Sequence, residues 1–102
     1  MGGLLATPVA DTLKLVASDS SQVETTIDRR HLWRALTPQM FRCGALRQAL
    51  KAAIASGYPV TDEASAMEYA GNAPCIVEGR PDNIKITVPA DLALAGFILS
   101  HL

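Results

Sequence analysis

Gly-Leu-Leu-Ala-Thr-Pro-Val occupies residues 3–9 of the chain. The run is mostly apolar and lacks the apolar–polar alternation of a strand with one wet face. It therefore predicts a β-strand covered on both faces, as in the parallel sheets of α/β proteins. Such a strand needs a neighbour on each side, so we expect part of the fold to precede Met1.

The next part of the chain predicts a β-hairpin. Two strand-like stretches, residues 12–16 and 22–27, flank the polar tract Ala-Ser-Asp-Ser-Ser at 17–21. Apolar and polar residues alternate in the second stretch, which indicates a strand with one wet face. A lone hairpin is only marginally stable in water, so we expect this one to pack on something.

Helical and strand-like segments alternate in the rest of the chain. Apolar residues recur at helical spacing over 41–56, and Gly57 and Pro59 follow as end signals. The hydroxyl of Thr61 and the two acids after it predict the start of a second helix. The remaining predicted elements are a strand at 75–77, a loop at 79–83, a strand at 84–88 and a last helix that Pro89 opens and that runs through Leu92, Ala95 and Leu99. This alternation predicts part of an α/β sheet from which the hairpin projects.

Composition and charge exclude several classes of protein. The 102 residues carry nine basic and ten acidic side chains, and 49% of them are apolar. We expect one small folded domain rather than a disordered chain. The balanced charge argues against nucleic acid as a partner, and no apolar run near either end is long enough to span a membrane. The first residues lack the basic region of a signal peptide, so we expect a cytoplasmic protein.

Cysteine and histidine spacing predicts no metal site. Cys43 and Cys75 lie far apart without Cys-x-x-Cys spacing, and His31 and His101 do not stand at ligand spacing from them. We expect the two cysteines to be buried free thiols in a reducing compartment.

Residues 28–34 form the first of three clusters that could carry chemistry. They place three arginines around Trp33. Arginines in such a group could hold a phosphate through bidentate guanidinium contacts. The alternative is a solvated basic stretch in which Trp33 anchors the core.

The other two clusters surround a helix start and a lysine. Residues 61–66 offer hydroxyls and backbone N–H groups that could bind an anion; the alternative is an ordinary helix cap, because Asp62 and Glu63 already bring negative charge there. Residues 82–87 place Lys85 inside a predicted strand. That lysine either faces solvent or reaches the carboxyl edge of the sheet, where α/β proteins bind ligands.

Five stretches, which together cover nearly the whole chain, stand in a recognisable order and spacing. They are residues 2–14, residues 28–29, Ala-Leu-Thr-Pro-Gln-Met-Phe at 35–41, Thr-Asp-Glu-Ala-Ser-Ala-Met-Glu at 61–68, and 77–95 with Asp-Asn-Ile-Lys-Ile-Thr at 82–87. Each motif alone is weak, but the five in register resemble the C-terminal half of the 2-C-methyl-D-erythritol 4-phosphate cytidylyltransferase family.

This resemblance implies a reaction and an architecture. The family transfers CMP from CTP to methylerythritol phosphate and releases pyrophosphate, in the non-mevalonate route to isoprenoids. It implies the C-terminal part of a Rossmann-like nucleotidyltransferase fold and a homodimer. The hairpin, at about residues 12–27, becomes an arm that reaches over the active site of the partner subunit.

The resemblance also implies which residues bind the substrate. Thr12 and Arg29, in or beside the arm, would contact the sugar phosphate bound to the other subunit. Thr37, Thr61 and Lys85 would line the methylerythritol phosphate pocket of their own subunit. Cationic groups suit this task, because the substrate phosphate attacks the α-phosphorus of CTP and its oxygens must be oriented in line.

The resemblance implies, in addition, what residues 1–102 do not carry. The family's N-terminal half holds the Gly-rich triphosphate loop and an acidic residue linked to Mg²⁺, and we expect neither here. No catalytic residue is therefore expected in this segment, and the isolated chain is expected to be inactive. Two alternatives stay open: a non-catalytic dimerising or substrate-binding fragment, and a related sugar-phosphate nucleotidyltransferase, against which the motifs at 61–64 and 82–85 argue.

Overall fold

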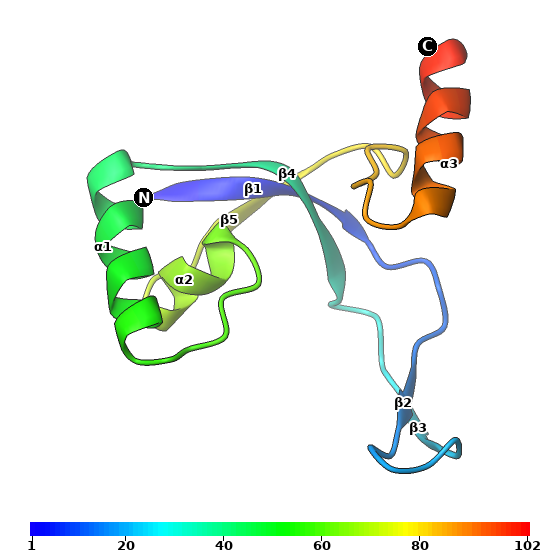
Figure 1. Ribbon diagram of the computed structural model, residues 1–102, viewed down its shortest axis with the longest axis horizontal. Helices are drawn as coiled ribbons and strands as arrows, with labels where there is room; N and C mark the ends of the chain where they lie inside the picture. Colours follow the sequence, from blue (N-terminus) through cyan, green and yellow to red (C-terminus); the bar gives the residue numbers. More distant parts are fainter.

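Strand β1 (Gly2–Pro8) is the central strand of a three-stranded sheet in the computed structural model, which describes residues 1–102 (Figure 1). Its neighbours are β4 (Trp33–Phe41), which runs antiparallel to it, and β5 (Cys75–Glu78), which runs parallel. The strand predicted over 3–9 is confirmed, and both of its neighbours come from later parts of this chain. Gly3 lets β5 approach closely, because a Cβ there would lie 2.6 Å from the carbonyl oxygen of Cys75.

The sequence pattern does not predict β4, because a proline and several polar residues interrupt any regular alternation in it. Its pairing with β1 is irregular in the same region. Leu4 pairs with Gln39 and Ala6 pairs with Ala35, so residues 36–38 stand opposite one residue of β1. This bulge bends the strand and re-aims its side chains.

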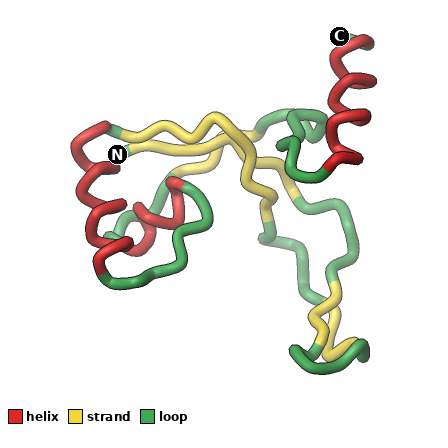
Figure 2. Tube along the Cα trace, viewed as in Figure 1, coloured by secondary structure: helices red, strands yellow, loops and turns green.

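The hairpin is formed by β2 (Lys14–Val16) and β3 (Val23–Thr26), which pair only with each other. It projects away from the sheet and from every helix (Figures 1 and 2). Val23 is 56% exposed, as expected for an element without a covering layer. The projecting hairpin is confirmed, and nothing in its own chain packs on it.

Helices α1 (Cys43–Ala55) and α2 (Glu63–Tyr69) pack on each other beside the end of the sheet where β1 begins (Figure 1). The buried residues of their contact are Ala49, Ala66 and Met67, and the half-buried side chains packed around them are Phe41, Leu46, Leu50 and Val60. The helix predicted over 41–56 is confirmed. Gly57, with a φ of +75°, ends it in the left-handed region that favours glycine.

Helix α3 (Pro89–Ser100) begins at a proline, as predicted, but stands apart from the other helices (Figure 1). None of its residues is buried, and Leu92 and Leu99 are 65% and 69% exposed. Its apolar residues therefore cover no core within these 102 residues. None of the helices combines the length and the apolar character that crossing a bilayer demands.

The strand predicted over 84–88 is wrong. These residues form neither helix nor strand. A ladder needs a hydrogen-bonding neighbour, and the sheet consists of β4, β1 and β5 alone, so this segment has none.

Three side chains that the sequence placed in the core lie on the surface. Cys43 and Cys75 are free thiols, but both are exposed: Cys43 begins α1, and every residue of the edge strand β5 is exposed. Trp33 is 39% exposed rather than a core anchor. It begins β4 at the point where the sheet gives way to the hairpin, and no layer covers it there.

Candidate functional site

A polar cavity of about 460 Å³ lies between β4, the start of α2 and the loop that follows β5. Thr37, Thr61 and Lys85 line it together, and they are three of the five site residues expected from the sequence. The other lining residues are Ala35, Leu36, Gln39, Asp62, Glu63 and Asn83. Three segments that are distant in the sequence thus converge on one space.

A second cavity, of about 370 Å³, lies between the same loop and α3. Six of its nine lining residues are hydrophobic, and its arginine, Arg80, is already paired with Asp82. Only the polar cavity combines an unpaired lysine with hydroxyls from separate elements. Because a phosphate ester needs such donors, the polar cavity is the candidate site.

The bulge of β4 brings Thr37 to the cavity. Its side chain is exposed and its hydroxyl makes no hydrogen bond within the chain. Its carbonyl oxygen accepts a hydrogen bond of 2.7 Å from Nδ2 of Asn83. Thr37 therefore anchors the loop through its backbone and keeps its hydroxyl available for a ligand.

The loop that carries Lys85 is tied to the sheet at its beginning. The N–H of Gly79 donates to the carbonyl of Ala6 at 2.8 Å, and Nη2 of Arg34 donates to the carbonyl of Pro81 at 3.1 Å. Together with the Asn83 bond, these contacts position the segment from which Lys85 extends. Lys85 thus lies beyond the carboxyl end of β5 and not within a strand, which favours the ligand-binding alternative over the solvent-facing one.

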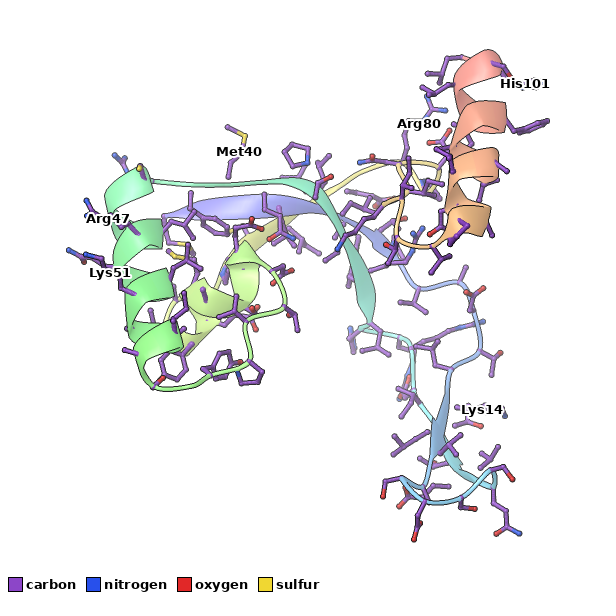
Figure 3. All side chains as sticks on the ribbon, in the orientation of Figure 1. Lys14, Met40, Arg47, Lys51, Arg80 and His101 are labelled. Atoms are coloured by element: carbon purple, nitrogen blue, oxygen red, sulfur yellow. The ribbon has the colours of Figure 1, made fainter.

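Two carboxylates stabilise the same loop. Arg80, labelled beside α3 in Figure 3, pairs with Asp82 at 2.6 Å. Hydrogen bonds from Arg80 hold the pKa of Asp82 below its ordinary value, and the Asp82 carboxylate raises the pKa of Arg80. At the other end, the N–H groups of Thr87 and Val88 donate to Asp91 and lower the pKa of its carboxyl.

At the start of α2, the capping residue is not the threonine that the sequence predicted. The N-cap is Asp62 and not Thr61, because Oδ1 of Asp62 accepts the N–H of Ser65 at 2.7 Å. In turn, Oγ of Ser65 accepts the N–H groups of Thr61 and Asp62. The N–H of Ala64 is also taken, by a side chain of β4. Four backbone donors here, those of Thr61, Asp62, Ala64 and Ser65, are thus already bonded within the chain, whereas the Thr61 hydroxyl is available to meet a ligand.

The cavity can therefore hold an anion that also carries hydroxyl groups. Lys85 is its one cationic lining residue, and its amine makes no hydrogen bond within the chain. The negative charge of Asp62 is offset by donors on both of its oxygens. Glu63 is exposed at the rim, where water screens its charge. A phosphate at Lys85 with sugar hydroxyls toward the threonines fits this arrangement.

Thr12 and Arg29 do not line the cavity. They lie at the base of the hairpin, where Nη1 of Arg29 donates to the carbonyl of Ala10 at 2.6 Å. Arg29 thus ties together the two chain segments that enter and leave the hairpin. Within one chain, the structure does not bring these two residues to the other three.

Sequence reasoning missed two residues of the cavity, Gln39 and Asn83, as parts of the site. Both lie inside motifs already singled out, at 35–41 and 82–87. Their roles depend on hydrogen bonds to partners at least 23 residues away, and such bonds leave no periodic signal. For Gln39, the one hint in the sequence is that an amide side chain in a strand needs a hydrogen-bond partner.

The Mg²⁺ ion that the resemblance implies does not fit residues 1–102. No group of three or more His, Cys, Asp or Glu side chains lies close enough to hold a metal ion. We therefore assign no step of the reaction to a metal through these residues.

Comparison with known proteins identifies the family. The model of the family described as 2-C-methyl-D-erythritol 4-phosphate cytidylyltransferase matches residues 1–101. Relatives with that name are 59% identical over 91% of this chain in Ectopseudomonas mendocina and 55% identical over all of it in Sodalis glossinidius. The match covers 39% and 43% of those relatives, so the chain spans about two fifths of their length.

Solved structures agree with the sequence comparison. The crystal structure of the Francisella tularensis 2-C-methyl-D-erythritol 4-phosphate cytidylyltransferase superposes with a TM-score of 0.80 and 39% identity, over 94% of this chain and 44% of that one. The sheet, the projecting hairpin and the helices are therefore part of the α/β nucleotidyltransferase fold of these enzymes. The chain belongs to the 2-C-methyl-D-erythritol 4-phosphate cytidylyltransferase family.

Proposed function

We propose that this chain supplies the methylerythritol phosphate pocket of a cytidylyltransferase that transfers CMP from CTP and releases pyrophosphate. The observation that carries the proposal is the convergence of Thr37, Thr61 and Lys85 on one cavity. Lys85 would hold the substrate phosphate, and the two threonine hydroxyls would hold the sugar chain. A phosphate held in this way is oriented as a nucleophile, which is a large part of the catalysis of phosphoryl transfer.

The CTP side of the reaction, including any Mg²⁺, belongs in this proposal to the part of the family domain that the match does not cover. The relatives are more than twice as long as the matched segment. The exposed α3 helix and its neighbouring apolar cavity are consistent with further structure packing there. The isolated chain is therefore proposed to bind substrate without turning it over.

A homodimer in which the hairpin reaches the partner's site completes the proposal. The hairpin exposes several apolar side chains, which a second subunit would cover. They are Leu13, Leu15, Val16 and Val23. Thr12 and Arg29 at the base of the hairpin would then meet the sugar phosphate of the other subunit. The cytoplasmic location expected from the sequence stays a prediction.

A chimera tests the reaction. In it, this chain replaces the segment that it matches in the Ectopseudomonas mendocina relative, and pyrophosphate release from CTP and methylerythritol phosphate is measured. The chimera should turn over, and residues 1–102 alone should not. Lys85→Ala in the chimera should raise KM for methylerythritol phosphate about tenfold to hundredfold, because a hydrogen bond to a charged group is lost.

The matched control is Lys51→Ala, a lysine that points outward from α1 (Figure 3) and is exposed. It should change neither KM. A chimera without turnover would favour the alternative of a non-catalytic fragment. A chimera that prefers another sugar phosphate would favour a related nucleotidyltransferase.

A further inference from the structure

Gln39 joins the two elements that carry Thr37 and Thr61. It is the first residue after the bulge of β4, and its side chain reaches the start of α2. Its Nε2 donates to Oδ2 of Asp62 at 3.0 Å, and its Oε1 accepts the N–H of Ala64 at 3.0 Å. Both ends of the side-chain amide are thus bonded to the start of the helix.

The chemistry of the partners fixes the orientation of this amide. The ionised carboxylate of Asp62 only accepts hydrogen bonds and the N–H of Ala64 only donates one. A reversed amide would set acceptor against acceptor and donor against donor. Gln39 and Asp62 are both half-buried, so water replaces lost bonds poorly at this position. Only one orientation of the Gln39 amide satisfies both partners.

Asp62 links the side chain of Gln39 to Thr61. Its Oδ1 accepts the N–H of Ser65, which caps α2, and Asp62 directly follows Thr61 in the chain. The apolar contact of β4 with the helices is made by Phe41, at the end of the strand. Beside the cavity, the hydrogen-bonded link between the strand and the helix is the side chain of Gln39.

We propose, on the basis of the proposed function, that Gln39 is a positioning residue for methylerythritol phosphate. Its hydrogen bonds to Asp62 and Ala64 set the separation of the Thr37 and Thr61 hydroxyls across the cavity. Gln39 acts through these two threonines. Its loss therefore weakens the fit of the sugar phosphate and leaves the binding of CTP intact.

The first test is Gln39→Met in the chimera, which keeps the length of the side chain and removes both hydrogen bonds to the helix start, together with a longer one of 3.4 Å to the carbonyl of Leu36. KM for methylerythritol phosphate should rise about tenfold, because the two threonine hydroxyls lose their fixed separation and misplaced binding groups lose much of their effect. KM for CTP should not change. Gln48→Met, the same substitution at an exposed position on α1, is the matched control and should change neither.

The second test exchanges the amide of Gln39 and the carboxylate of Asp62. Gln39→Glu sets a carboxylate against that of Asp62, in a cavity whose other charged residues are Glu63 and Lys85, and should raise KM for methylerythritol phosphate more than Gln39→Met does. Adding Asp62→Asn reverses the hydrogen bond, because the new amide donates to the new carboxylate. Its oxygen still accepts the N–H of Ser65. The double variant should recover most of the loss, because only the 3.4 Å hydrogen bond to the carbonyl of Leu36 stays unmade.

These outcomes separate this inference from the function on which it rests. An unsubstituted chimera without turnover contradicts both. An active chimera in which Gln39→Met leaves KM for methylerythritol phosphate unchanged contradicts the role of Gln39 alone. A lower melting temperature with unchanged KM, or a double variant no better than Gln39→Glu, would mean that Gln39 only supports the fold.

Discussion

Nδ2 of Asn83 donates a 2.7 Å hydrogen bond to the carbonyl oxygen of Thr37, across 46 residues of sequence. The bond fastens the loop before Lys85 to the bulge of β4. Two residues expected to contact the same substrate are thus held at a fixed separation by a third residue whose side chain bonds to the backbone. Side chains that orient ligand-binding groups in this way contribute to preorganisation.

Removing this bond should weaken substrate binding. Asn83→Ala leaves the loop without its link to Thr37, so Lys85 samples more positions. An exposed hydrogen bond contributes about 1 kcal/mol, so we expect KM for methylerythritol phosphate in the chimera to rise about fivefold. Asn72→Ala, at an exposed loop position, is the control. An unchanged KM for Asn83→Ala would show that the loop holds its shape without this bond.

The cap of α2 gives a prediction about stability. Asp62→Ala removes the acceptor for the N–H of Ser65 and should lower the free energy of unfolding by about 1 kcal/mol, the usual value of an N-cap. Asp62→Asn keeps the acceptor for Ser65 but sets a donor against Nε2 of Gln39, so it should keep the cap and lose the hydrogen bond to β4. Urea unfolding of the chimera measures both, with Glu24→Ala in the exposed hairpin as the control. Equal stability of Asp62→Ala and the unsubstituted protein would contradict the assignment of the cap.

Local patterns were sufficient for the elements whose signals are local. The apolar run at 3–9, the alternation at 22–27 and the helical spacing at 41–56 each predicted the element that forms there. Strand β4 was missed because its bulge breaks the alternation, and the strand at 84–88 was wrong because a ladder depends on a neighbour. The exposure of Cys43, Cys75 and Trp33 was also predicted wrongly, because the burial of a residue depends on which elements pack on it.

The candidate site likewise contains some residues that were predicted and others that were not. Thr37, Thr61 and Lys85 were expected from the resemblance, and the fold places them in one cavity. No composition or spacing rule would have joined three segments so far apart. The hydrogen bonds of Gln39 to the start of α2 and of Asn83 to Thr37 were beyond prediction, since each joins a side chain to a distant part of the chain.

The carboxyl of Asp91 gives a prediction about pH. Hydrogen bonds from the N–H groups of Thr87 and Val88 lower its pKa from the ordinary value of 3.8. The stability that it gives to the start of α3 is therefore fully present above that ordinary value. It is lost as the pH falls toward the lowered pKa.

NMR titration of the Asp91 carboxyl carbon should give a midpoint below 3.8, and the amide shifts of Thr87 and Val88 should follow the same curve. Asp91→Asn should abolish this pH-dependent change in the amide shifts of both residues. A midpoint for Asp91 at or above its ordinary value would contradict these bonds.

Arg29 and Lys85 are proposed to position one methylerythritol phosphate from opposite subunits. In the chimera, Arg29→Ala and Lys85→Ala should each reduce turnover, by up to about a hundredfold if the attacking oxygen moves by about 1 Å. KM for CTP should change little in either variant. Arg47→Ala, which removes a cation that points outward from α1 (Figure 3), is the control and should be neutral.

Mixing the two variants tests whether the site is shared. In a heterodimer with residues contributed from opposite chains, one site carries both defects and the other carries none. Random exchange of subunits should then restore about one quarter of the unsubstituted activity, because half of the dimers are mixed and each has one intact site. If both residues came from the same chain, every site of the mixed dimer would keep one defect and nothing would recover. Absence of recovery after demonstrated subunit exchange would therefore leave Arg29 with the role visible in the single chain, the bond to Ala10 that closes the base of the hairpin.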